Sequence, residues 1–249
     1  MIVSEVMTTK LITVTPDDTL SHAVNLLRQY QFHHLPVVAS TGSNEWTGYI
    51  SRGQNALPEF QGLLTSQDID LAAAMGKLSS SDLLHRPWQE RLVAEVMHRA
   101  TIRVTPSTSV AAAAQLLVER GLNCLPVVEY EQTGQDEGGK TRAMLVGLLT
   151  RSDLLIALAR SLGAFEPGME LTIQLLPGDL RPLAETLVLA AQLHIQVRSV
   201  IAAPQESGVP QVATVRLGTI NPAPLLMRLQ EANIHYTFAG SLVEGDGHD

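Results

Sequence analysis

The sequence predicts an α+β protein in which two copies of a β-α-β-β-α unit are followed by a smaller β-α-β-β-α-β unit. The first observation is a repeat. Shifting the chain by 90 residues aligns 3–38 with 93–128 without a gap and gives 15 identities in 36 positions. The second is that strand-like and helix-like apolar spacings follow each other in the same order in both copies. The third is a change of pattern after residue 168, where a differently ordered unit begins.

Composition places the chain among globular proteins. It has 249 residues, of which 45% are hydrophobic and 17% charged, enough for two or three compact units. A net charge of -8 argues against a nucleic-acid partner, because phosphate neutralisation needs clustered Lys and Arg. The single cysteine, Cys124, excludes an intramolecular disulfide and fits a reducing compartment. With neither a signal-peptide pattern nor a membrane-length apolar run, we expect a cytoplasmic protein without a membrane partner.

Each repeat is expected to run strand, helix, strand, strand, helix. In the first copy these are LITVTP (11–16), a helix capped by Asp or Thr (17–31), HHLPVV (33–38), the strand GLLT (62–65) and the helix SQDIDLAAAMG (66–76). WTGYI (46–50) is an alternative start for the third of these strands, but SRGQNALPEFQ (51–61) interrupts it, so GLLT is the favoured strand before the helix. In the second copy the polar, glycine-rich segment EYEQTGQDEGGKT (129–141) predicts a mobile surface loop. The boundaries expected are 1–78 for the first repeat with an insertion at 39–61, 79–92 for a linker, 93–162 for the second repeat, 169–241 for the third unit and 242–249 for a disordered tail.

The repeated phrase GLLTSQDI (62–69) and GLLTRSDL (147–154) is open to two interpretations. In the structural one, Thr is a helix N-cap and Asp completes a capping box. In the functional one, the helix start and the Thr hydroxyl bind a phosphate, and Asp accepts the hydroxyls of a ribose. Arg151 lies between them in the second copy and is suited to a bidentate phosphate contact, whereas the first copy has Ser66 there.

The repeated EVM, VTP, LPVV and GLLTxxD segments resemble the cystathionine-β-synthase (CBS) domain, which occurs in tandem pairs, over about residues 1–160. The resemblance implies a pseudo-two-fold pair whose cleft binds an adenosine ligand: AMP, ADP, ATP, S-adenosylmethionine or NAD. It implies that the Thr and Asp positions hold phosphate and ribose and that the strands near Ile12 or Ile102 and the residues before LPVV flank the adenine. The nucleotide-binding residues expected are Thr150, Arg151, Asp153, Ile102, Arg103, Cys124, Thr65, Asp68, Ile12, Thr13 and His34. The second copy, with its arginine, is expected to be the tighter phosphate site.

The third unit reads as a strand (MELTIQLL), a PGDL turn, a helix (181–195), a hairpin around SGVP, a second helix begun by prolines and a last strand (HYTFAG). This order is the ferredoxin-like one, with both helices on one face of a four-stranded antiparallel sheet. The LLPGDLRPLAETL segment resembles an ACT domain, a small-molecule sensing module. The resemblance implies an amino-acid site at Gly178, Asp179 and Leu180, or dimerisation without a ligand. Two CBS motifs before an ACT module also resemble regulatory proteins of the acetoin-utilisation AcuB type.

The sequence contains no recognisable motif for catalysis or metal binding. His33 and His34 are adjacent on a strand and therefore point to opposite faces, and the second copy has Asn123 and Cys124 there. We expect no catalytic residue, no metal and no obligatory cofactor. The leading hypothesis is a non-enzymatic sensor, expected to form a homodimer and to act on a regulated enzyme partner. The alternative is a structural or protein-interaction module with empty CBS clefts and a ligand only at the ACT-like unit.

Overall fold

The computed structural model describes residues 1–39, 49–50, 57–78, 87–99, 102–133, 140–176, 179–202 and 211–238. The chain divides into two compact units, 1–155 and 156–249, and the division falls within helix α4 (Arg151–Ser161). The expected tail at 242–249, most of the insertion at 39–61 and residues 79–86 of the linker lie outside the described residues.

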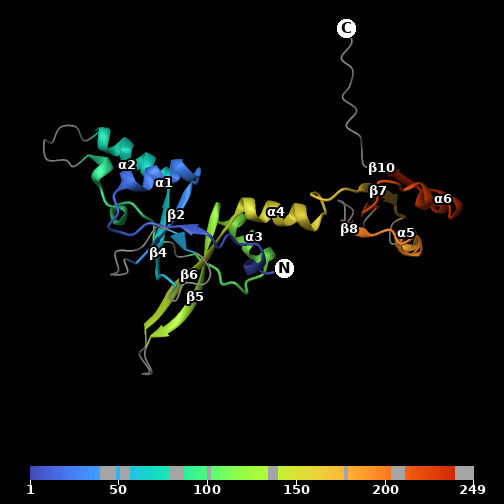
Figure 1. Ribbon diagram of the computed structural model, residues 1–249, viewed down its shortest axis with the longest axis horizontal. Helices are drawn as coiled ribbons and strands as arrows, with labels where there is room; N and C mark the ends of the chain where they lie inside the picture. Colours follow the sequence, from blue (N-terminus) through green and yellow to red (C-terminus); the bar gives the residue numbers. More distant parts are fainter. Residues whose placement is uncertain are drawn as a thin grey trace, which may run out of the picture. The chain divides into compact units, whose positions relative to one another are not determined.

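The first unit contains both repeats (Figure 1). The first repeat comprises β1 (Leu11–Ile12), α1 (Leu20–Tyr30), β2 (His34–Val38), β3 (Tyr49–Ile50), β4 (Phe60–Thr65) and α2 (Ser66–Leu78). The second comprises α3 (Val110–Glu119), β5 (Cys124–Thr133), β6 (Lys140–Thr150) and the start of α4. The side-chain oxygen of Thr19 caps α1 by accepting a hydrogen bond from the backbone N–H of His22. Of the two residue types expected as the cap, Asp or Thr, the structure therefore has Thr. The first repeat has the expected order with one strand more, because β3 and β4 are separate strands: β3 pairs with β1, and β4 pairs with β2.

Two of the expected elements differ in the structure. The strand at 11–16 is shorter, because beyond Ile12 only Val14 makes a bridge, to Val37; its counterpart in the second repeat is a single bridge between Val104 and Val127. The prediction of a surface loop at 129–141 is wrong at both ends of that range. Residues 129–133 belong to β5 and residues 140–141 to β6, and the two strands form one long antiparallel hairpin (Figure 1). Cross-strand pairs such as Tyr130 with Ala143 support this hairpin despite its polar composition.

Each repeat completes the core of the other through the segment that precedes its first strand. Val3 and Met7, at the start of the chain, are buried in the second repeat's core, with Val104, Leu117 and Leu125 among their neighbours. Backbone bonds fix this arm: Val3 N–H donates to the Thr108 carbonyl at 2.9 Å.

The second repeat reciprocates. Val93 is fully buried in the first repeat's core, and its N–H donates to the Asp18 carbonyl at 2.8 Å. The N–H of Leu20, at the start of α1, donates to the Arg91 carbonyl at 2.9 Å. The two arms, residues 1–9 and 91–99, are therefore exchanged between the repeats, and neither repeat has a complete core of its own.

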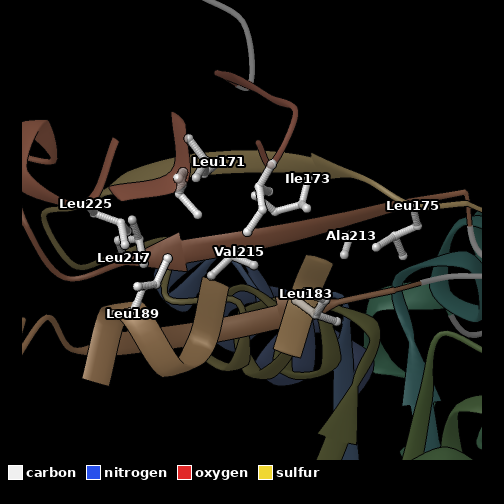
Figure 2. Packing of buried hydrophobic residues seen from close by; sticks show 12 residues of the cluster. Leu171, Ile173, Leu175, Leu183, Leu189, Ala213, Val215, Leu217 and Leu225 are labelled. Atoms are coloured by element: carbon white, nitrogen blue, oxygen red, sulfur yellow. The ribbon is translucent and has the colours of Figure 1, made fainter. Parts of the chain in front are cut away.

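The second unit has the expected β-α-β-β-α-β order over its described residues. Its elements are β7 (Met169–Gln174), α5 (Arg181–Gln192), β8 (Val197–Ile201), β9 (Val212–Leu217), α6 (Ala223–Glu231) and β10 (Tyr236–Phe238). The strands form one antiparallel sheet in the order β10-β7-β9-β8. Alternate residues of β7 and β9 point to the two helices, and Figure 2 shows Leu171, Val215 and Leu217 packed with Leu183 and Leu189 of α5 and Leu225 of α6. One face of the sheet is thus covered by both helices, as expected.

Candidate functional site

Both Thr-x-x-Asp segments form the capping box that the structural interpretation predicts. Thr65 ends β4, and its N–H and hydroxyl donate to Asp68 Oδ2 at 2.8 and 2.7 Å, while Asp68 N–H donates to the Thr65 hydroxyl at 3.2 Å. Thr150 and Asp153 repeat this geometry between β6 and α4, at 2.8, 2.7 and 3.1 Å. The box fixes each helix start, and it uses only one of the two oxygens of each carboxylate.

The second oxygen of each carboxylate contacts the arm of the other repeat. Asp68 Oδ1 lies 2.5 Å from His98 Nε2, and Asp153 Oδ1 accepts a hydrogen bond from the Thr8 hydroxyl at 3.1 Å. Positions 8 and 98 are equivalent under the 90-residue repeat. Each capping box is therefore bonded to the arm of the other repeat. The two boxes are equivalent by the internal repeat, but their partners differ chemically, because one is the imidazole of His98 and the other is the hydroxyl of Thr8.

The glycine of each GLLT segment allows the arm to pass close to the strand. Leu63 and His98 exchange two backbone hydrogen bonds of 2.8 and 2.9 Å, and Thr8 and Leu148 exchange two of 2.9 Å. A Cβ at Gly62 would lie 2.5 Å from the His98 carbonyl oxygen. Hence this glycine is required by the approach of a neighbouring backbone.

A cavity opens beside each capping box. The first, of about 580 Å³, is bounded by Thr65, Ser66 and Asp68 of the first repeat and by His98, Arg99 and Ile102 of the second; we call it site 1. The second, of about 540 Å³, is bounded by Thr150, Arg151 and Ser152 of the second repeat and by Thr8, Lys10 and Ile12 of the first; we call it site 2. Both volumes are typical of small-molecule sites.

The two sites share a wall. His33, His34 and Asn123 line both cavities, where the turn before β2 meets the turn before β5. The apolar parts of the lining include Ile102, Leu122 and Pro126 at site 1 and Leu11, Phe32 and Pro36 at site 2. Each cavity thus combines a polar end at a helix start with an apolar wall.

The structure brings most of the predicted nucleotide-binding residues into these two sites. Site 1 contains Thr65, Asp68, Ile102, Cys124 and His34, and site 2 contains Thr150, Arg151, Ile12 and His34. Asp153 is outside the lining of site 2 but is bonded to Thr8 and Thr150, which line it. Thr13 is buried and Arg103 half-buried, and neither is among the described residues that line site 1 or site 2.

Some lining residues were missed by sequence reasoning. Lys10, Arg99, His98 and Phe32 differ between the repeats, so the identities that revealed the repeat do not include them. Arg151 carries a constraint that the sequence does not show, since its Nε donates to the Leu122 carbonyl at 2.8 Å. This bond anchors the base of the guanidinium across the turn before β5.

The predicted amino-acid site is only partly described. Gly178 lies outside the described residues, and Leu180 is exposed. Asp179 accepts hydrogen bonds from the N–H and the guanidinium of Arg181, which lower the pKa of its carboxyl to about 2. The Asp179 carboxylate is thus already paired with a cation.

Burial sets the chemistry of two residues in site 1. Desolvation raises the pKa of the Cys124 thiol to about 12, so this thiol stays protonated and is no nucleophile at neutral pH. Desolvation also lowers the pKa of His34, helped by the adjacent His33 and opposed by Asp68. The half-buried imidazole of His34 is therefore kept neutral.

The lowered pKa of His34 predicts a pH dependence of the ligand-free protein. Because the unfolded chain takes up a proton more readily than the folded one, the contribution of His34 to stability is complete above pH 6.5 and is lost as the pH falls below it. We expect the melting temperature to fall between pH 7.5 and pH 5.5 less steeply in His34→Gln than in the wild type. His22→Gln, on an exposed position of α1, is the control and should leave the slope unchanged. Equal slopes in all three proteins would contradict this account.

The described part of the chain contains neither a metal-binding cluster nor a membrane-spanning helix. No group of three or more His, Cys, Asp or Glu side chains within it is placed to hold a metal ion. None of its helices has the length and apolar character needed to span a membrane.

Comparison with known proteins identifies the duplicated unit. Residues 3–53 and 93–160, which lie in the two repeats, match the CBS domain model. The CBS domain-containing protein YhcV of Bacillus subtilis is 26% identical over 155 residues, which cover 62% of this chain and 83% of YhcV.

Two solved structures are each similar to about two thirds of the chain. The structure of CBSX2 in complex with AMP is 26% identical, covers 63% of this chain and 95% of its own, and has a TM-score of 0.42. A Vibrio cholerae protein described as an acetoin utilization protein (AcuB) is 24% identical, covers 67% of this chain and 98% of its own, and has a TM-score of 0.44.

Proposed function

We propose that this chain is a non-enzymatic regulatory protein that binds an adenine nucleotide in the clefts of its tandem CBS domains. The observation that carries the proposal is the composite construction of the two sites. Each site joins a capping box from one repeat to the arm of the other, as the contacts of Asp68 with His98 and Asp153 with Thr8 show. A ligand in either cavity therefore touches both repeats and is sensitive to their arrangement.

The parts of a nucleotide match the parts of each cavity. The first turns of α2 and α4 line the cavities, and the positive end of a helix dipole favours a phosphate there. Arg99 at site 1 and Lys10 and Arg151 at site 2 supply cations for the phosphate. The apolar walls suit a purine base, and the outer oxygens of Asp68 and Asp153 can accept ribose hydroxyls in exchange for His98 and Thr8.

Regulation follows if the ligand binds two arrangements of the repeats with different affinity. The exchanged arms provide such a difference, because each arm lines one site and also contributes to the core of the opposite repeat. A ligand that displaces His98 or Thr8 from its aspartate thereby alters a segment on which the other repeat depends. A regulated partner would then bind the two arrangements of the repeats with different affinity.

The proposal predicts that AMP, ADP or ATP raises the melting temperature of the full chain. At a ligand concentration of 100 times the Kd, the stabilisation is about 2.7 kcal/mol, which corresponds to about 5–10 °C for a unit of this size. Differential scanning fluorimetry with a concentration series of each nucleotide measures this shift. No shift with these three, nor with S-adenosylmethionine or NAD, would contradict the proposal.

For the second unit we propose an ACT-like accessory role, either amino-acid sensing or pairing of two chains. Its β-α-β-β-α-β order and its sheet with both helices on one face support this role. The same fluorimetric screen, extended to amino acids, separates the two possibilities, because only sensing gives a shift at constant protein concentration.

A further inference from the structure

The two sites differ in the charged groups that line them. At site 1 the described lining contains one cation and one carboxylate, Arg99 and Asp68. At site 2 it contains two cations, Lys10 and Arg151, and no carboxylate. Asp153 is bonded to Thr8 and Thr150, which line site 2. When its charge is included, the sum of these fixed charges is +1 at site 2 and 0 at site 1.

The repeat shows where this difference comes from. Arg151 is the first residue of α4, and its equivalent in the first repeat is Ser66, the first residue of α2. Lys10 has Ala100 as its equivalent in the second repeat. Arg99, whose equivalent is Thr9, supplies site 1 with one cation, but Asp68 lies in the same cavity. Both cations of site 2 are thus absent from the equivalent positions of site 1.

The environment of Asp68 strengthens the contrast. Its side chain is 11% exposed and lies within the wall of the cavity, where its Oδ2 is bonded to Thr65 and its Oδ1 to His98. A phosphate bound in site 1 would meet this carboxylate as well as Arg99, whereas a nucleoside without phosphate needs only an acceptor for its hydroxyls. The titratable groups that face site 1 besides these two are His33, His34, His98 and Cys124. The neutral state favoured for His34 and the protonated thiol of Cys124 add no charge at neutral pH.

We propose that the two sites bind adenine ligands of different charge at the same time: site 2 a nucleoside di- or triphosphate, and site 1 an uncharged adenine nucleoside. This inference rests on the proposed function, and it adds a ligand class for each site. A charge-assisted hydrogen bond contributes a factor of about 10 to 100 in affinity. We therefore expect ATP to prefer site 2 over site 1 by at least about tenfold.

The test is isothermal titration calorimetry of the full chain with ATP and then adenosine, at pH 8.0 and without divalent cations. The wild type should bind one ATP per chain tightly, and the ATP-saturated protein should then bind one adenosine per chain. Two equal ATP sites, or no adenosine binding to the ATP-saturated protein, would overturn the inference and leave the proposed function standing. No binding of either compound would overturn both.

The repeat supplies matched variants for the same titration. Arg151→Ser gives site 2 the residue that site 1 has, and it should weaken ATP binding by about 10 to 100 times while adenosine still binds. Ser66→Arg makes the reciprocal change and should raise the number of tight ATP sites from one to two. The inference would be contradicted if the Ser66→Arg protein still has one tight ATP site and the Arg151→Ser protein binds ATP as tightly as the wild type. The charge of the lining would then not determine which ligand each site binds.

Discussion

Replacing Asp153 with alanine is expected to remove most of the thermal shift that ATP produces in the full chain. Asp153 orients Thr150 through two hydrogen bonds and fixes the start of α4 beside Arg151, so its loss disorders the phosphate end of site 2. It also removes the acceptor of the Thr8 hydroxyl, which is the carboxylate oxygen that we propose to bind a ribose hydroxyl in its place. We expect at least about a tenfold loss of ATP affinity, together with a loss of about 0.5–2 kcal/mol in ligand-free stability from the broken cap. Fluorimetry with and without ATP measures both effects.

The chain contains a matched control for this variant. Thr15 and Asp18 form a similar Thr-x-x-Asp turn, in which the N–H and hydroxyl of Thr15 donate to Asp18 Oδ2 at 2.6 and 3.0 Å. Asp18 lines neither site. Asp18→Ala should lower ligand-free stability by a similar amount and keep the full ATP shift. An ATP shift in Asp153→Ala as large as in Asp18→Ala would show that the box at 150–153 has only a structural role.

Replacing Gly62 with alanine is expected to give a large loss of stability. The new Cβ would lie 2.5 Å from the His98 carbonyl oxygen, which is held by its backbone hydrogen bond to Leu63 and cannot move without shifting the arm. Overpacking of this kind costs about 1–3 kcal/mol, and each kcal/mol lowers the melting temperature of a unit of this size by about 2–4 °C. Thermal and urea unfolding of the ligand-free chain measure the loss.

Gly147→Ala is the internal comparison, because it makes the equivalent change in the second repeat. There the new Cβ would first meet Met7 Sδ, at 2.5 Å, and a methionine side chain can rotate away more easily than a backbone carbonyl. Gly147→Ala should therefore be milder than Gly62→Ala. Two neutral substitutions would contradict the close crossing of arms and strands on which both sites depend.

The repeat and its local structure could be predicted from the sequence because both depend on short-range signals. The Thr-x-x-Asp boxes are set by residues three apart, and the spacing of Leu20, Ala23 and Leu27 is enough to indicate α1. The β-α-β-β-α-β order of the second unit followed from the same kind of pattern. These features do not depend on which distant segment lies beside them.

The exchange of arms could not be predicted in this way. The apolar residues of the arms, such as Val3 and Val93, fit a core of either repeat, because the two cores are built from related sequences with the same apolar spacing. The pairing of each box with His98 or Thr8 depends on that exchange, and so does the placement of Lys10 and Arg99 in opposite sites. The hairpin of β5 and β6 was missed for a related reason, since its polar strands are supported by pairing across the hairpin and carry little apolar alternation.

The most direct test of the central claim is a crystal structure of the full chain grown with ATP. Nucleotide binding between the repeats predicts ATP in site 2, with its phosphates beside Lys10 and Arg151 at the start of α4 and its base against the apolar wall that includes Phe32. ATP bound only within the second unit, or crystals with both cavities free of nucleotide at saturating ATP, would contradict it.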